Sequence, residues 1–187
     1  MITGIIGPMF SGKSSEMLRL ADRKHIAGKK TLLIRPEKDS RNFIARNHSG
    51  NLDYIDTVEI VDDFMNEARL QGWVNEYDAI FVDEFWMIKN NIVLCKMLPT
   101  NGSKTDIYFC GIWANVNQEL WPEAISIIPW FDETKYLPAI CMDCHSEHAT
   151  HNVRIDGNKK VATDIGAGVG DSEYKVVCRK CYIERYL

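Results

Sequence analysis

The segment from Gly7 to Ser14 constrains the fold more than any other part of this chain. It reads Gly-Pro-Met-Phe-Ser-Gly-Lys-Ser and directly follows a short apolar run over residues 2–6. This is the G-x-x-x-x-G-K-[ST] spacing of a phosphate-binding P-loop, which joins a strand to a helix. Backbone N–H groups of such a loop surround phosphate oxygens, and the positive end of the following helix favours the anion. The sequence therefore predicts a nucleoside triphosphate site, with Lys13 on the outer phosphates and Ser14 on Mg²⁺; a glycine-rich turn without a ligand is the alternative.

Composition narrows the class of protein. A chain of 187 residues with 45% apolar content can bury one sizeable core and carry a small appendage. No apolar run approaches the roughly 20 residues that span a bilayer, so we expect no membrane partner and a cytoplasmic location. The net charge of −4 argues against nucleic acid as a partner, because a phosphate-backbone binder usually needs a clustered basic surface.

Apolar runs alternate with helical patterns along the first two thirds of the chain. We expect strands at 31–34, 58–61, 78–84 and 106–111, helices at 14–27 and 62–72, and a long loop over 36–57. Asp62 or Asp63 is the expected cap of the second helix. Strands alternating with helices predict an α/β fold with a mostly parallel sheet flanked by helices, whose ligand site lies at the carboxyl ends of the strands.

Two carboxylates end the apolar run before residue 85. Asp83 and Glu84 resemble a Walker B element, in which the aspartate holds Mg²⁺ or its water and the next carboxylate accepts a proton from the nucleophile. A helix N-cap followed by a dipole-compatible glutamate is the alternative. In the long loop, Arg41 is placed to stabilise a transferring phosphoryl group or else is a solvated surface residue.

The C-terminal part carries two C-x-x-C pairs, Cys141 with Cys144 and Cys178 with Cys181. Two such pairs fit a tetrahedral zinc site, and four thiolates leave no open position, which predicts a structural metal. Disulfides are the alternative, which a reducing compartment disfavours. Cys95 and Cys110 lie in apolar runs, where a free cysteine is most often a small core residue.

Together these residues resemble the type II thymidine kinase family, the cytosolic tetrameric kind. The resemblance rests on residues 7–14, 38–41 and 82–84 and on both cysteine pairs, in matching order and spacing. It implies a P-loop kinase domain over residues 1–138 that binds ATP and Mg²⁺. It also implies a small zinc-binding domain over residues 139–187, whose lid (lasso) loop over residues 165–174 covers a nucleoside.

By the same resemblance, Glu84 takes the proton from a deoxynucleoside 5′-hydroxyl group as that group attacks the γ-phosphate. The implied acceptor is thymidine or deoxyuridine, and the implied assembly is a homotetramer. The expected catalytic residues are Lys13, Arg41 and Glu84. The expected ATP and Mg²⁺ contacts are Gly7, Pro8, Met9, Phe10, Ser11, Gly12, Lys13, Ser14, Asp39 and Asp83. The expected nucleoside contacts are Met9, Trp86, Met87, Trp121, Ile165, Gly166 and Tyr174.

The chain departs from the family pattern after Asp-Glu, where a small residue, Gln and Phe are usual. Phe85, Trp86 and Met87 occupy these places, and Trp121 lies in the segment that is usually rich in Phe. Trp86, Met87 and Trp121 either contact a pyrimidine or are core residues. Three alternatives to a thymidine kinase follow: a kinase with a shifted deoxynucleoside specificity, a nucleic-acid-dependent ATPase with a zinc ribbon, and a non-catalytic nucleotide sensor.

Overall fold

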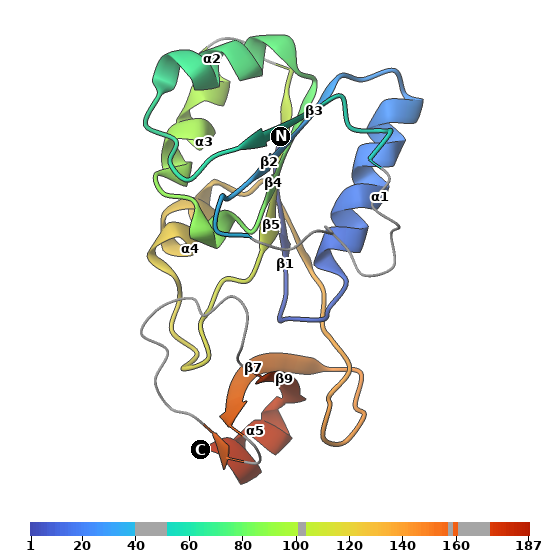
Figure 1. Cartoon of the computed structure of the whole chain (residues 1–187), viewed down its shortest axis with the longest axis vertical. Helices are drawn as coiled ribbons and strands as arrows, with labels where there is room; N and C mark the ends of the chain where they lie inside the picture. Colours follow the sequence, from blue (N-terminus) through green and yellow to red (C-terminus); the bar gives the residue numbers. More distant parts are fainter. Residues whose placement is uncertain (40–51, 101–103, 157–158, 161–172) are drawn as a thin grey trace.

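The computed structural model describes residues 1–39, 52–100, 104–156, 159–160 and 173–187. Figure 1 shows a large sheet covered by helices and, beyond one edge of it, a smaller sheet with the C-terminal helix. The larger sheet has six strands in the order β3-β2-β4-β5-β1-β6, and all of its pairings are parallel. Its strands are β1 (Ile2–Ile6), β2 (Thr31–Arg35), β3 (Thr57–Ile60), β4 (Ala79–Asp83), β5 (Asp106–Gly111) and β6 (Glu133–Tyr136).

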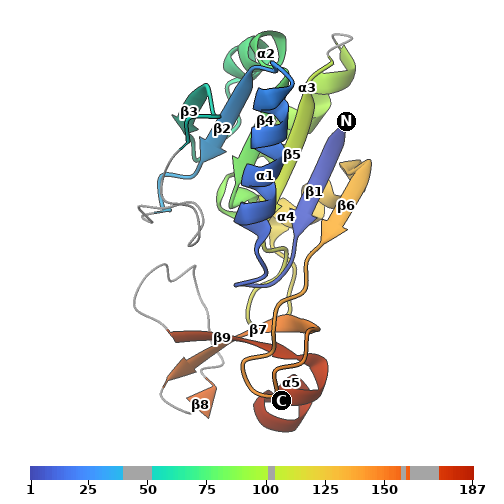
Figure 2. The same ribbon diagram turned by 90° about the vertical axis from the view of Figure 1, so that its right-hand side faces the viewer.

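The central strands are apolar on both faces because helices cover both faces of the sheet. Every residue of β1 and β4 is buried, as expected for parallel strands inside an α/β fold. Helix α1 covers one face, and α2, α3 and α4 cover the other (Figures 1 and 2). The helices are α1 (Lys13–Ile26), α2 (Glu67–Glu76), α3 (Asn91–Thr100) and α4 (Pro122–Ile127). The predicted parallel sheet flanked by helices is confirmed.

Helix α1 packs on the sheet through Met17, Leu18 and Ala21, which lie at helical spacing and are at most 1% exposed. It ends next to Gly28, whose φ of 68° is the left-handed conformation of a helix C-cap. The N–H of Gly28 donates to the carbonyl of His25 at 2.8 Å. The sequence prediction of a helix over 14–27 is therefore confirmed to within a residue.

The helix predicted over 62–72 is wrong in position, because α2 begins only at Glu67. Asn66 caps it, with its side-chain oxygen accepting from the N–H of Arg69 at 3.0 Å. Asp62 and Asp63, the predicted caps, bond to other loops instead. Asp62 accepts from the N–H of Glu37 at 2.8 Å, and Asp63 accepts from the side chain of Asn90 at 2.8 Å.

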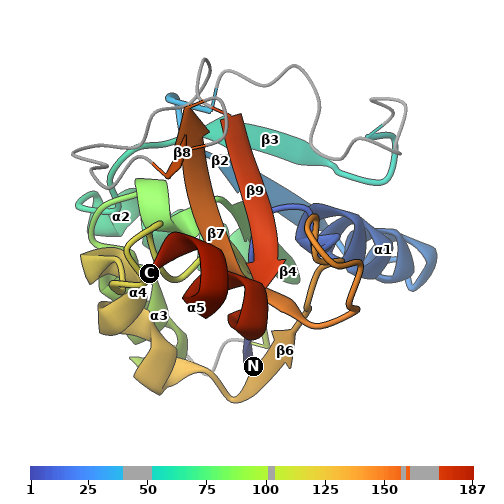
Figure 3. The same cartoon turned by 90° about the horizontal axis from the view of Figure 1, so that it is seen from below.

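The smaller sheet has three antiparallel strands in the order β8-β7-β9, which are β7 (Ala149–Asp156), β8 (Lys159–Lys160) and β9 (Glu173–Cys178). Helix α5 (Arg179–Tyr186) packs against it. Figure 3 shows β7, β9 and α5 lying in front of the larger sheet when the molecule is seen from below. The smaller sheet thus faces the carboxyl ends of the parallel strands. The predicted boundary between residues 138 and 139 stays a prediction, and most of the predicted lid loop lies outside the described residues.

Within the described ranges, no helix has the length and apolar character needed to cross a bilayer.

Candidate active site

The carboxyl ends of β1, β4 and β5 form one edge of the larger sheet. Ile6 at the end of β1 pairs with Gly111, and Asp83 at the end of β4 pairs with Cys110. Because the strands are parallel, the segments that follow β1 and β4 leave the sheet from this same edge. The structure therefore brings the P-loop and the Asp83-Glu84 pair together, although 76 positions separate Gly7 from Asp83 in the sequence (83 − 7).

The first glycine of the P-loop is required by a close backbone approach. A Cβ atom at Gly7 would lie 2.1 Å from the carbonyl oxygen of Leu137 and 2.8 Å from Ser11 Oγ, so any larger residue would force the loop apart. The neighbouring N–H of Leu137 donates to the carbonyl of Ile6 at 2.8 Å, which fixes this approach. Further along the loop, Phe10 and Gly12 have φ angles of 61° and 81°, which turn the chain back into α1.

The start of α1 has the donors of an anion site. Gly12 is its N-cap and supplies no side-chain acceptor, and the first N–H groups of a helix point outward from its start, where they can bind an anion. Lys13 is 8% exposed, and its ammonium group donates to the carbonyl of Pro8 at 2.6 Å, inside the loop. Ser11 Oγ is buried and has no hydrogen-bond partner among the described residues. Donors gathered around a glycine-lined turn in this way fit a phosphate group.

Asp83, Glu84 and Lys13 lie around one thiol. Burial raises the pKa of Cys110 well above its ordinary value, the negative charges of Asp83 and Glu84 raise it further, and Lys13 opposes them. Asp83 is 0% exposed, and both of its carboxylate oxygens are buried. The buried carboxylate of Asp83 supplies oxygen atoms, the ligand type that Mg²⁺ prefers, at the edge where the P-loop leaves the sheet. The residues present therefore fit both the nucleotide phosphates and their metal ion.

Glu84 begins a tight turn with an unusual backbone. Its φ and ψ of 47° and 45° are left-handed, a conformation that costs a non-glycine residue free energy and persists only where the surroundings fix it. The side chain of Asn91, which is 0% exposed, donates to the carbonyls of Phe85 and Ile88 at 2.8 and 2.7 Å and holds this turn. The indole N–H of Trp86 donates to Glu84 Oε2 at 2.6 Å.

Aromatic rings gather beside this turn. The rings of Trp86 and Trp121 are stacked, with centroids 4.8 Å apart and an interplanar angle of 28°. Met87 follows Trp86 in the same 3-10 turn, and its N–H donates to the carbonyl of Glu84 at 2.9 Å. Of the predicted nucleoside contacts, the structure thus brings Trp86, Met87 and Trp121 to the Glu84 turn.

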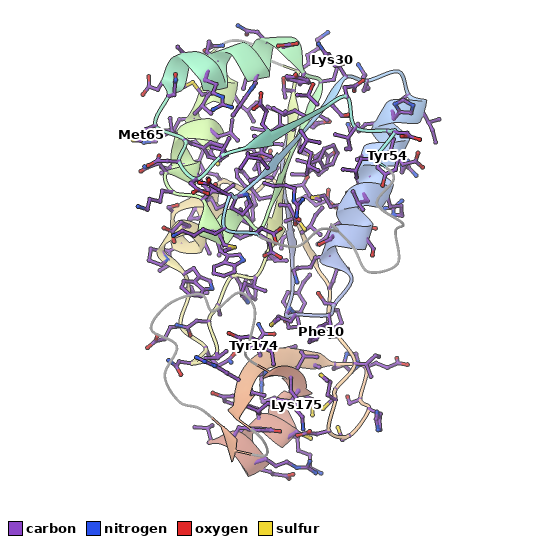
Figure 4. The ribbon with its side chains drawn as sticks, in the orientation of Figure 1. Phe10, Lys30, Tyr54, Met65, Tyr174 and Lys175 are labelled. Atoms are coloured by element: carbon purple, nitrogen blue, oxygen red, sulfur yellow. The ribbon has the colours of Figure 1, made fainter. Side chains whose placement is uncertain are left out.

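Figure 4 shows that Phe10 and Tyr174 lie at the level where the P-loop faces the smaller sheet, whereas Lys30, Tyr54 and Met65 lie toward the other end of the molecule. Tyr174 belongs to β9, where it pairs with Arg154 of β7. The last predicted nucleoside contact in the described part of the chain is therefore carried by the smaller sheet.

One residue that joins the two sheets was missed by the sequence reasoning. Asn152 of β7 is 7% exposed, and its side-chain oxygen accepts from the N–H of Met9 in the P-loop at 2.8 Å. Its own carbonyl accepts from the side chain of Gln118, in the segment between β5 and α4, at 3.2 Å. No local pattern marks Asn152, because its partner Met9 lies far away in the sequence.

The predicted metal ligands come together beside the smaller sheet, from the segment before β7, the end of β9 and the start of α5. The sulfur atoms of Cys141, Cys144, Cys178 and Cys181 all lie within 4.8 Å of one another. Tetrahedral zinc with bonds of about 2.3 Å requires sulfurs about 3.8 Å apart, and Cys144 and Cys178 are 3.6 Å apart. Burial opposes ionisation of Cys141, but backbone hydrogen bonds from Cys178, Cys144 and Asp143 lower its pKa to about 6, which favours the thiolate that a metal binds. The cluster fits a structural zinc ion, as the spacing predicted.

The remaining predicted residues belong to the long loop and the lid. The carboxylate of Asp39 accepts from the guanidinium of Arg35 at 2.9 Å, and only 2% of its side chain is exposed. Arg41, Ile165 and Gly166 lie outside the described residues. Their predicted roles stay predictions.

Comparison with known proteins identifies the family. The family model described as "Thymidine kinase" matches residues 1–182. The chain belongs to the thymidine kinase family. A thymidine kinase of Acanthamoeba polyphaga mimivirus is 31% identical over 96% of this chain and 80% of its own length. The thymidine kinase of Amsacta moorei entomopoxvirus is 31% identical over 97% of both chains, and that of sheeppox virus is 30% identical over 95% of this chain and 94% of its own.

Membership of this family makes the chain an enzyme of the deoxynucleoside-phosphorylating class. The resemblance read from the P-loop, the Asp-Glu pair and the cysteine pairs is confirmed. The match over residues 1–182 takes in both sheets and all four cysteines, so the smaller sheet belongs to the family's common structure. A nucleic-acid-dependent ATPase is correspondingly disfavoured.

Proposed function

We propose that this chain transfers the γ-phosphoryl group of ATP to the 5′-hydroxyl group of thymidine or deoxyuridine. The observation that carries this proposal is the single edge where the phosphate-binding start of α1 meets Asp83 and Glu84, opposite the smaller sheet. A phosphoryl acceptor between these parts would be in reach of a general base and of the phosphate donors at once. Positioning and charge stabilisation supply most of the catalysis in such a transfer.

The P-loop holds the phosphates in this proposal. The uncapped N–H groups that follow Gly12 bind phosphate oxygens, and the Lys13 ammonium exchanges the carbonyl of Pro8 for the outer phosphates. Ser14 and Asp83 would hold Mg²⁺, which when bound neutralises charge on the transferring group. Arg41, from the segment that follows Asp39, adds positive charge to the same group.

Glu84 is the proposed general base. Its carboxylate accepts the proton of the 5′-hydroxyl group, so that the oxygen becomes a better nucleophile as the new O–P bond forms. Glu84 directly follows Asp83 at the carboxyl end of β4, so it would lie next to the proposed metal site. The left-handed backbone held by Asn91 supports such a task, because strained residues of this kind cluster at functional sites.

The nucleoside would lie between the P-loop and the smaller sheet. Met9, Trp86, Met87, Trp121 and Tyr174 are its proposed contacts in the described part of the chain, and Ile165 and Gly166 are proposed contacts from the lid. A zinc ion in the four-cysteine cluster would fix the sheet that carries this lid. The domain division at residue 138, the homotetramer and the cytoplasmic location stay predictions that accompany this function.

The substitution Glu84→Gln tests the chemistry. We expect turnover to fall by about 10²–10⁴-fold, the usual contribution of a general base, while ATP affinity changes little. Glu76→Gln is the matched control, because Glu76 is an exposed glutamate at the end of α2, before β4 begins. Labelled ATP and thymidine give the rate, and turnover of Glu84→Gln close to that of wild type would refute the assignment.

A kinase with a shifted deoxynucleoside specificity is the second candidate. The stack of Trp86 on Trp121 favours it, because these two large rings occupy positions where the family pattern has other residues. A panel of deoxynucleosides with labelled ATP decides between the two. Phosphorylation of thymidine and deoxyuridine ahead of deoxycytidine and the purine nucleosides supports the first candidate, and the opposite order supports the second.

A further inference from the structure

Trp86 holds the carboxylate of Glu84 through its indole N–H. The Nε1 to Oε2 distance is 2.6 Å, a short hydrogen bond of the kind made to an ionised acceptor. A glutamate has several rotatable bonds, and an unrestrained side chain would spread over many rotamers. The bond selects among these rotamers.

The Trp86 ring is itself restrained on two sides. One contact is the stacked ring of Trp121, with centroids 4.8 Å apart. The other is Gly111 at the end of β5, where an added Cβ atom would lie 3.1 Å from a ring carbon of Trp86 and from one of Phe85. The absence of a side chain at residue 111 lets both rings pack against the strand. The indole N–H therefore points from a nearly fixed ring.

The backbone between the two residues is restrained as well. The two carbonyls that Asn91 binds, those of Phe85 and Ile88, belong to the turn that contains Trp86. The N–H of Met87 closes this turn on the carbonyl of Glu84 at 2.9 Å. The packing of the Trp86 ring and the hydrogen bonds of the turn together restrain the indole N–H donor and the Glu84 carboxylate acceptor to one arrangement.

We propose that Trp86 is a positioning residue: it fixes the Glu84 carboxylate in the rotamer that receives the proton of the sugar hydroxyl group. This role of Trp86 rests on the proposed function of Glu84 as the general base. Trp86 then acts on the reaction through Glu84, by its bond to Oε2. The competing role for this ring is direct stacking on the nucleobase, which would act on binding of the nucleoside.

The two roles separate in steady-state kinetics of Trp86→Phe, which keeps an aromatic ring and removes the N–H donor. Positioning predicts that kcat falls by about tenfold to a hundredfold, the effect of a displaced catalytic group, with KM for the nucleoside changed less than about threefold. Base stacking predicts a raised nucleoside KM with kcat nearly unchanged, and that result would overturn the proposal. Trp113→Phe is the control, because the Trp113 ring packs on Tyr136, with centroids 5.4 Å apart, whereas the indole N–H that bonds to Glu84 belongs to Trp86.

A double-mutant cycle tests whether Trp86 acts through Glu84. In a Glu84→Gln background, Trp86→Phe should lower residual turnover less than about twofold, since the group it positions has lost its function. If the two losses multiply, the positioning role is refuted while the general base stands. If Glu84→Gln alone keeps full turnover, the proposed function of Glu84 fails instead.

The bond also has a readout that does not depend on activity or on the folding of Trp86→Phe. The chain has five tryptophans, so its indole N–H groups give few resonances in a nitrogen-proton spectrum. Replacing Glu84 with Gln should shift one of them, the one from Trp86, far more than the others, because the charged acceptor becomes neutral. The signal is assigned by its loss in Trp86→Phe or, if that variant does not fold, in Trp86→Tyr. An unchanged Trp86 resonance in Glu84→Gln would overturn the proposal.

Discussion

The bond between Asn152 and the P-loop should contribute measurably to stability. Asn152→Ala removes the oxygen that accepts from the N–H of Met9 at 2.8 Å, and it leaves the Asn152 backbone in place to bind Gln118. A buried donor without an acceptor costs about 1–3 kcal/mol. Because Met9 is only partly buried, water can reach its N–H in part, and we expect the lower half of that range, about 1–2 kcal/mol. For a chain of 187 residues this lowers Tm by about 2–8 °C.

The same substitution should weaken binding of nucleotide. Met9 lies in the middle of the P-loop, between the close approach at Gly7 and the left-handed Phe10, so its N–H bond restrains the loop that binds phosphate. If the full 1–2 kcal/mol is lost from the stability of the loop conformation that binds ATP, ATP affinity drops by about 5–30-fold. Thermal unfolding and equilibrium binding of an ATP analogue measure the two effects.

Two variants control for the change of side chain. Asn152→Asp keeps an acceptor oxygen and should retain most of both properties. Asn117→Ala removes an exposed asparagine side chain near the same segment and should leave both unchanged. If Asn152→Ala is indistinguishable from Asn117→Ala in Tm and in ATP affinity, the bond does not restrain the P-loop and the reasoning fails.

Two further predictions concern the metal cluster and the first turn of α1. Cys178→Ser should release zinc, lower Tm and raise the KM for the nucleoside, and Cys144→Ser should have the same three effects. Atomic absorption measures the metal content. Equal metal content in wild type and both variants would contradict a structural zinc site. Hydrogen bonding from Arg19, with help from Lys135 against the cost of burial, lowers the pKa of Glu16 from 4.5 to about 2. Because the pKa of Glu16 is lower in the folded state, its ion pairs add to the free energy of unfolding above pH 4.5, and this contribution is lost as pH falls toward 2. Glu16→Gln should therefore lower the free energy of unfolding by about 1 kcal/mol at pH 7 and by almost nothing near pH 2. Chemical denaturation at both pH values checks this, and a cost that does not depend on pH would refute the ion-pair reasoning.

The parts of the fold that the sequence predicted are those with a local signal. Buried parallel strands are continuous apolar runs, and the glycines of the P-loop are forced by backbone geometry, so β1, α1 and β4 were found near their true ends. The helix predicted from Asp62 failed because its aspartates bond to Glu37 and Asn90, contacts that no window of local sequence contains. A capping residue is recognised by its type, but only the tertiary structure decides which of several candidates caps.

The residues of the candidate site also divide into those that have a local sequence signal and those that do not. Lys13, Asp83 and the cysteine pairs were predicted from the spacing of their motifs. The structure brings the four cysteines together, and the roles of Lys13 and Asp83 stay predictions. The bond from Trp86 to Glu84 could not be predicted, because it needs a left-handed glutamate, the ring of Trp121 and a glycine at residue 111 at once. Each of these is unremarkable alone. Their combined effect exists only in the folded chain.

Asn152 connects two halves of the proposed site that are stabilised by different means. The proposed phosphate half is built on the six-stranded sheet, whose core clusters include residues of β1 and α1. The proposed nucleoside half is carried by a three-stranded sheet whose small core includes three of the four cysteines, where a bound metal ion would hold its ends together. Since Met9 is a proposed contact of the nucleoside and a member of the P-loop, restraint at its N–H acts on both substrates. Loss of the metal should therefore reach ATP binding through Asn152, and Asn152→Ala should make ATP affinity insensitive to Cys178→Ser.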